Sequence, residues 1–153
     1  MHYVATLIRR RPRTLTALGF GAAGSGLSIL WWSPVIFQGR GLLLFVLFIG
    51  TPGVSAAVAG WIFGKTLFDG ARVSGPRSAA LWGMVIASLA LLLFAPLFAT
   101  FYVLIQPATE HWDIVSLTFL ILLGSAVAIW WLVALAGAAV GWALYRLASY
   151  NAG

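Results

Sequence analysis

Long uncharged stretches separated by short polar segments are the main pattern in this sequence. The stretches predict four membrane-spanning helices, at about residues 14–37, 42–67, 79–105 and 114–145. A span needs about 20 consecutive, mostly apolar residues, and each of these runs is longer than that. We therefore expect an all-α integral membrane protein whose single transmembrane domain, residues 1–153, is a four-helix bundle.

Short polar segments mark the expected ends of the spans. A turn at 38–41 separates the first two spans, and a polar loop with glycine and proline, at 69–78, separates the second from the third. Pro107 ends the third span, because its missing N–H and its ring stop a helix. The loop at 110–113 then leads into the fourth.

Cations predict the orientation of the chain. With four crossings, one side of the membrane carries Arg40 and the acidic residues Glu110 and Asp113. Short cytoplasmic segments are enriched in Lys and Arg, so we expect both termini to be cytoplasmic, in a bacterial inner membrane. The cations that would share the cytoplasmic side are Arg9, Arg10, Arg11, Arg13, Lys65, Arg72, Arg77 and Arg146.

Composition supports a membrane protein and argues against nucleic-acid binding. Hydrophobic residues make up 62% of the chain, charged residues 8%, and the net charge is +6. A soluble domain carries about 25% charged residues. Most of the cations flank a span or lie in a short loop, where they set topology. The chain has no cysteine, which excludes disulfides and thiol chemistry.

The N-terminal segment could also be interpreted as a signal peptide. Arg9 to Arg13 would be its basic region and Ala22-Ala23-Gly24 its cleavage site. The apolar run continues to Phe37, however, and is longer than the 7–15 residues of a signal-peptide core. An uncleaved first helix is the favoured interpretation.

Two parts of the sequence repeat the same pattern, which predicts two αα hairpins of the same orientation, related by an axis along the membrane normal. The alternative is that interfacial Trp and Arg anchors arose independently in each helix. The matched residues are Pro12, Arg13, Thr14 and Gly19 with Pro76, Arg77, Ser78 and Gly83, and Ala57, Gly60, Trp61 and Lys65 with Ala138, Gly141, Trp142 and Arg146.

Small residues at four-residue spacing predict how the helices associate. Such faces let two backbones approach closely in a membrane, where apolar side chains are solvated equally well by lipid. Pro52-Gly53, near the middle of the second span, predicts a kink. The predicted helix-packing residues are Gly21, Gly60, Gly64, Gly83, Gly137 and Gly141.

No ionisable side chain lies deep in any predicted span, and this argues against an enzyme or an ion-coupled transporter. Glu110, His111 and Asp113 lie in one short loop, and their spacing matches no metal site, so no metal is predicted. No cofactor is predicted either, although a bound lipid, quinone or pigment stays open.

One weak set of polar and aromatic residues lies near the expected bilayer centre. Counting about 1.5 Å per residue places its serines on the order of 15 Å from the inner ends of the spans. The set could line a small polar cavity. Alternatively, the hydroxyls bond their own i−4 carbonyls and the indoles fill space. The residues are Ser25, Thr51, Ser55, Ser88, Trp130 and Trp131.

Two functions follow from these patterns. The first is a non-enzymatic, multi-pass accessory subunit that packs against partner transmembrane helices, membrane lipid or a lipophilic cofactor. The alternative is a small homo-oligomeric transporter or channel with a pathway near the Pro52-Gly53 kink, lined by Ser25, Thr51 and Ser55.

Overall fold

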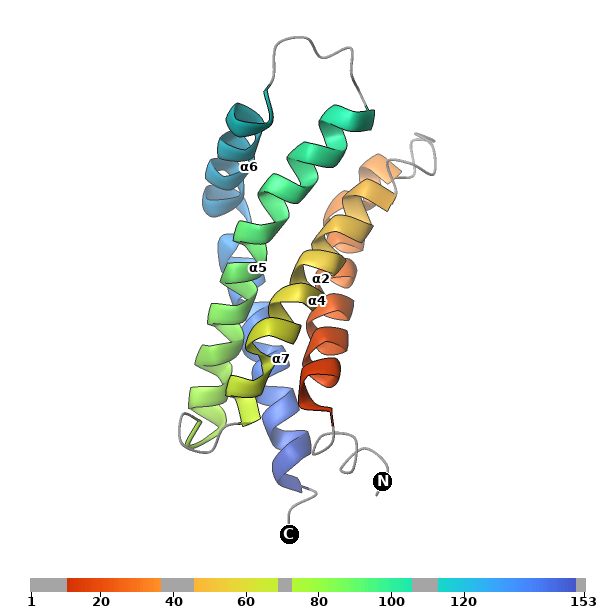
Figure 1. Cartoon of the computed structure of the whole chain (residues 1–153). Helices are drawn as coiled ribbons and strands as arrows, with labels where there is room; N and C mark the ends of the chain where they lie inside the picture. Colours follow the sequence, from red (N-terminus) through yellow and green to blue (C-terminus); the bar gives the residue numbers. More distant parts are fainter. Residues whose placement is uncertain (1–10, 37–45, 69–72, 106–112, 151–153) are drawn as a thin grey trace.

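The chain folds into an elongated set of helices that run along one long axis (Figure 1). The computed structural model describes residues 11–36, 46–68, 73–105 and 113–150, and within these ranges it contains helices and no strand. The main helices are α2 (Pro12–Ile36), α4 (Thr51–Phe63), α5 (Pro76–Ile105), α6 (Ile114–Ala128) and α7 (Trp130–Tyr150). The all-helical prediction is confirmed for this part of the chain.

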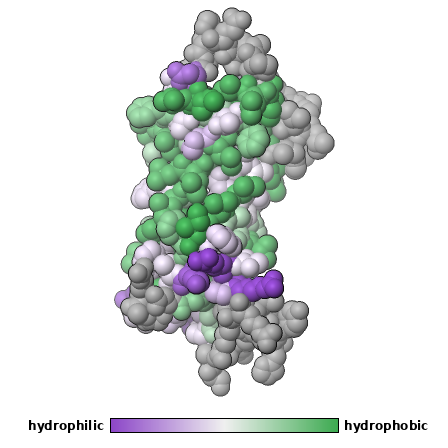
Figure 2. Space-filling view, in the orientation of Figure 1, coloured by the Kyte–Doolittle hydropathy of each residue, from purple (hydrophilic) through white to green (hydrophobic). Residues whose placement is uncertain are grey.

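Three helical stretches are long and apolar enough to cross a membrane. They are Leu47–Phe68, Pro76–Ile105 and Trp130–Ser149, whereas α6 is a shorter apolar helix of 15 residues. Because these stretches carry at most two charged residues in an 18-residue window, a membrane location fits them. Figure 2 shows the apolar surface in the middle of the molecule, with polar residues gathered toward its ends.

The first helix pair consists of α2 and α4, which lie against each other through small residues. A Cβ added at Gly60 would lie 2.8 Å from the Thr16 carbonyl oxygen, and one at Gly24 would lie 2.9 Å from the Pro52 carbonyl oxygen. At Gly21 the Cβ of Ala57 would be 3.1 Å away. The two backbones therefore approach too closely for larger side chains at these positions.

The second helix pair consists of α5 and α7, and it is closer still. A Cβ added at Gly141 would lie 2.9 Å from the Gly83 Cα, and one at Gly137 would lie 2.5 Å from the Gly83 carbonyl oxygen. Gly83 itself faces the Gly137 backbone. These three glycines are consequently used inside the chain, between its own helices.

The same contacts recur in both pairs, but one residue out of register with the sequence repeat. Contacting residues of α2 and α5 differ by 63 in number (79−16 and 87−24), whereas Pro12 and Pro76, which begin these helices, differ by 64. Because one residue turns a helix by about 100°, this shift places the contacting face about 100° away from the face that the sequence repeat predicts. The matched contacts are Thr16 with Gly60 and Gly24 with Ala56, and Ala79 with Gly141 and Ala87 with Gly137.

Within the fourth predicted span, 114–145, the structure contains two helices, α6 and α7, rather than one continuous helix. Ile129 has φ −126° and ψ −8° and separates α6 from α7, although its N–H still donates to the Ser125 carbonyl. The two parts are held differently. α7 is fixed against α5 by close glycine contacts, whereas α6 has no buried residue, so nothing forces the two onto a common axis.

The predicted irregularity in the second span coincides with a change of helix type. A π-helical turn, η1 (Val46–Gly50), precedes α4, and a 3₁₀ segment, η2 (Gly64–Phe68), follows it. Pro52 lies in the first turn of α4, directly after the helical residues of η1, so its missing N–H interrupts the hydrogen bonding of a continuous helical stretch. π-turns are a recognised cause of helix bending.

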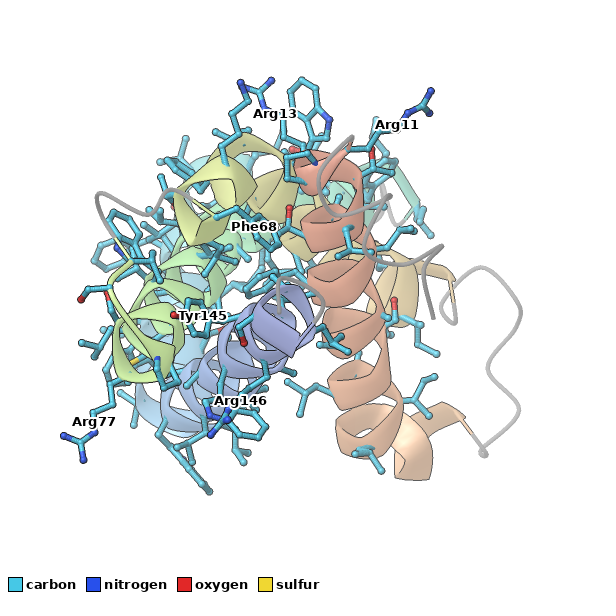
Figure 3. All side chains as sticks on the ribbon, turned by 90° about the horizontal axis from the view of Figure 1, so that it is seen from below. Arg11, Arg13, Phe68, Arg77, Tyr145 and Arg146 are labelled. Atoms are coloured by element: carbon cyan, nitrogen blue, oxygen red, sulfur yellow. The ribbon has the colours of Figure 1, made fainter. Side chains whose placement is uncertain are left out.

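The two pairs meet in a core near the end of the molecule where α2 begins and α7 ends. Phe20, Ala59, Leu67, Ile86 and Leu144 bring together all of these elements and are almost completely buried. Arg11, Arg13, Arg77 and Arg146 lie at this same end (Figure 3). We call it the basic end. The start of α6, which Asp113 caps, lies at the opposite end of the molecule (Figure 1). We call this the α6 end.

Candidate functional site

An apolar cleft lies between the two helix pairs, on the α6 side of the core. Its volume is about 470 Å³. It has four walls, which are formed by α2, by α4 with η1, by α5, and by α6 with α7. The lining residues are Gly24, Leu27, Ser28, Phe48, Pro52, Ala56, Ala87, Ala90, Leu91, Phe94, Phe98, Tyr102, Ile121, Gly124, Ser125, Ile129, Leu132 and Val133.

One face of α5 forms the longest wall of the cleft. Its residues recur at steps of three and four, which places them on one side of a helix. Ala87 and Ala90 are small and lie at the deep end, whereas Phe94, Phe98 and Tyr102 follow toward the α6 end. The cleft therefore begins where the buried core stops and continues along α5 to its last turn.

Aromatic rings line the half of the cleft near the α6 end. The Phe98 ring centroid lies 5.3 Å from those of Phe48 and Phe94, and 6.1 Å from that of Tyr102. The Phe98 and Tyr102 rings are nearly parallel, at 15°. Such offset pairs stabilise one another beyond their buried area, so this wall is a connected aromatic surface.

No charged side chain is among the described residues that line the cleft. The Ser28 hydroxyl donates to the Gly24 carbonyl at 2.8 Å, which satisfies it within its own helix. A lining of this kind favours an uncharged, apolar occupant, because a buried charge needs a paired group.

The break at Ile129 shapes the remaining wall. Ile121, Gly124 and Ser125 of α6 face the cleft from one side of the break, and Leu132 and Val133 of α7 face it from the other. A Cβ added at Gly124 would meet nothing within 4 Å. The α6 wall is thus thin at Gly124 and leaves open space beside it.

None of the six residues predicted to form a midplane cavity is among those that line the cleft. The Thr51 hydroxyl donates to the Leu47 carbonyl, Ser55 to the Thr51 carbonyl at 2.8 Å, and Ser88 to the Met84 carbonyl at 2.9 Å. These are the i−4 bonds of the alternative interpretation. The hydroxyls of Thr51 and Ser55, which were predicted to line a transport path, therefore already donate hydrogen bonds to carbonyls of their own helical stretch.

The structure does bring some of these residues together in pairs. The Trp130 indole N–H donates to the Ser88 hydroxyl at 3.2 Å, and the Ser25 hydroxyl lies against Gly53. Trp131, in contrast, is 55% exposed. The set is divided between the α2–α4 pair and the α5–α7 pair rather than gathered around one space.

The sequence did not predict the cleft residues, because most of them are apolar and none is charged. Gly24, Phe94, Phe98 and Gly124 are ordinary residues of a membrane helix. The one usable sign was the three-and-four spacing of small and aromatic residues along 87–102, which marks a single face. It takes the helix arrangement to show that this face is only partly covered.

Two cations at the basic end lie over Trp rings. The Arg13 guanidinium is 5.0 Å from the centre of the Trp61 ring, and that of Arg146 is 5.5 Å from the Trp142 ring. The cation over Trp61 therefore comes from a different helix, α2. Cation–π contacts of this kind suit the boundary between membrane and water.

The acidic loop contributes one described residue. Glu110 and His111 lie outside the described residues. The Asp113 carboxylate accepts the Ser116 N–H at 2.6 Å and thereby caps α6. This hydrogen bond lowers the pKa of Asp113 from its ordinary value of 3.8, because it stabilises the ionised form.

Comparisons with protein-family models, with curated proteins and with solved structures found no match for this chain.

Proposed function

We propose that this chain is a non-enzymatic, multi-pass membrane subunit that holds a lipophilic molecule in the cleft between its two helix pairs. The observation that carries the proposal is the cleft itself, of about 470 Å³ and without a charged lining residue. Ligand pockets typically measure about 300–1,000 Å³ and are mostly apolar. A cleft of this size and chemistry suits a small lipophilic ligand.

The proposal includes four membrane crossings with both termini on the cytoplasmic side of a bacterial inner membrane. The starts of α2 and α5 and the ends of η2 and α7 lie at the basic end (Figure 1). Together α6 and α7 extend over 114–150, which at about 1.5 Å per residue exceeds the roughly 30 Å of a hydrocarbon core. Cytoplasmic enrichment in Arg and Lys supports placing the basic end inside.

Partner helices form a second part of the proposal. The glycine contacts of α2, α4, α5 and α7 are satisfied within the chain, so they are not the surface offered to a partner. α6 has no buried residue, and Val115, Phe119 and Val127 are each more than two-thirds exposed. This face is available to lipid or to a neighbouring helix.

The alternative, a transporter or channel near Pro52-Gly53, has one observation in its favour. Pro52 lines the cleft, next to the π-helical turn η1. The cleft lining, however, offers few polar groups to a hydrophilic substrate. Thr51 and Ser55 are buried and bonded to carbonyls of their own helix. The binding subunit is therefore the better supported proposal.

Purification in a mild detergent or in nanodiscs tests the proposed function. The full chain is extracted from its native membrane, and the mass and the absorbance of the particle are measured. We expect a lipophilic small molecule, or a partner protein with one, in a constant ratio to the chain. A particle that contains this chain alone, and that conducts solutes after reconstitution, would favour the transporter instead.

A further inference from the structure

The cleft has the dimensions of a binding site for a single hydrocarbon chain, and we propose that it binds one acyl chain of a membrane lipid. The lipid belongs to the leaflet at the α6 end, with its headgroup beyond Tyr102. This inference rests on the proposed function, because it names the class of lipophilic molecule that the cleft holds.

The length of the cleft fits one leaflet. Along α5 it extends from Ala87 to Tyr102, which corresponds to about 22 Å at 1.5 Å per residue. α5 has 30 residues, so Ala87 lies near its middle and Tyr102 near its end. One leaflet contributes about 15 Å of hydrocarbon, and about 20–22 Å with its headgroup region. An occupant of this length therefore reaches from the bilayer centre to the headgroup level.

The cleft suits a single flexible chain better than a partner helix. An α-helix with its side chains is at least about 10 Å wide and would fill roughly 1,500 Å³ or more over this length. The cleft holds about 470 Å³. A single flexible chain fits between the walls, whereas a whole helix would reach beyond them.

The chemistry of the walls matches a hydrocarbon chain. The lining carries no charge, and Phe48, Phe94 and Phe98 form a continuous aromatic surface along it. An empty cleft would forfeit the dispersion contacts of these walls, and an apolar cavity does not retain water well. Hydrocarbon from the surrounding bilayer is the material that fills it without either cost.

The headgroup end is also marked. Tyr102 is the cleft residue nearest the end of α5, and tyrosine is enriched where membrane meets water. Arg11, Arg13, Arg77 and Arg146 lie at the basic end (Figure 3), away from this position, and Lys65 lies in η2.

Two glycines supply a matched pair of variants. Gly124 lines the cleft, Gly26 does not, and a Cβ added at either would meet nothing within 4 Å. Gly124→Leu places a bulky side chain at the α6 wall of the cleft, whereas Gly26→Leu adds the same side chain to a helix away from it. Ser125→Leu is a second filling variant, on the adjoining cleft residue.

The experiment uses the full chain in nanodiscs that contain phosphatidylethanolamine with a diazirine near the end of one acyl chain. After illumination, labelled peptides are identified by mass spectrometry, and lipid adducts of the intact protein are counted in mild detergent. We expect labels concentrated on 87–102 and 121–133 and a retained adduct of one lipid. Both should be lost in Gly124→Leu and Ser125→Leu and kept in Gly26→Leu.

Other outcomes overturn the inference in distinguishable ways. Labels spread evenly over exposed residues outside these two segments, such as Leu30 and Val54, and unchanged in Gly124→Leu, contradict an acyl-chain site. If Gly124→Leu instead removes a quinone, a pigment or a partner protein, the lipid inference fails while the proposed function stands. If the variant changes no bound species at all, both fail.

Discussion

The indole N–H of Trp130 donates a hydrogen bond to the hydroxyl of Ser88, 3.2 Å away, and joins the first residue of α7 to the middle of α5. The bond lies one residue after the helix break at Ile129. It holds the start of α7 against α5 at the point from which α6 diverges. Because α6 forms one wall of the cleft, the bond helps to set the position of that wall.

Removing this bond should weaken the α5–α7 pair slightly. We expect a double-mutant cycle of Trp130→Phe and Ser88→Ala to give a coupling energy of about 0.6 kcal/mol, the average for hydrogen bonds between membrane helices. The measurement is unfolding of the full chain in mixed detergent and sodium dodecyl sulfate. A coupling energy of zero would mean that the two groups do not bond in the membrane.

Thr16 should contribute more, because it is completely buried. Its hydroxyl lies 2.8 Å from the Gly60 carbonyl of α4 and 2.9–3.0 Å from two carbonyls of its own helix. Thr16→Val keeps the shape and removes the donor, so we expect a loss of about 1 kcal/mol in the free energy of unfolding. Thr14→Val, at an exposed position, is the control and should change it by less than about 0.5 kcal/mol.

Glycine-to-alanine changes should separate packed from open positions. At Gly141 the new methyl would lie 2.9 Å from the Gly83 Cα, whereas at Gly26 it would meet nothing within 4 Å. We expect Gly141→Ala to destabilise the protein by about 1–3 kcal/mol. Gly26→Ala should be neutral or stabilising, by up to about 1 kcal/mol, because alanine favours the helix. Equal effects in the same unfolding assay would contradict the α5–α7 contact.

Acid should release the start of α6. The pKa of Asp113 lies below 3.8 in the folded chain, chiefly because of the Ser116 N–H. A lowered folded pKa means that the cap stabilises the helix above the ordinary pKa and is lost as the pH falls through the folded value. We expect the Ser116 amide to lose its protection from hydrogen exchange in that window.

Asp113→Asn provides the comparison for this experiment. Asparagine caps helices well and does not titrate, so exchange of the Ser116 amide in this variant should follow the ordinary pH dependence of exchange. Asp113→Ala should expose the amide at every pH. If the native chain and Asp113→Asn behave alike down to pH 2, the carboxylate does not act as the cap.

The sequence predicted the all-helical fold and three helical stretches long and apolar enough to cross a membrane, but it did not predict the cleft. Arg13 and Pro76 are among the charges and prolines that mark the starts of α2 and α5. Such signals can be found in the sequence because they depend only on neighbouring residues. The small residues that face each other in the two pairs were also visible as four-residue spacings. The sequence did not show which helix each of these faces would contact, because the spacing is the same whether the partner helix lies in this chain or in another.

The break at Ile129 shows why the site could not be predicted. No proline, glycine or charge lies at this position, and the uncharged run around it indicates one long helix. The break follows from tertiary contacts, since α7 is held by Gly137 and Gly141 whereas α6 has no buried residue. Trp130 was noticed as unusual, but its partner Ser88 is 42 residues away.

Accessibility of single cysteines tests the membrane arrangement most directly, because the native chain contains no cysteine. Ser74 and Ser149, near the basic end, and Ser116, at the start of α6, are all exposed. Each is replaced by cysteine, and intact cells are treated with a membrane-impermeant maleimide before and after permeabilisation. We expect Ser116→Cys to react from outside and Ser74→Cys and Ser149→Cys to react after permeabilisation. Reaction of Ser116→Cys and Ser149→Cys from the same side would contradict the account, because α6 and α7 would then not cross the membrane together.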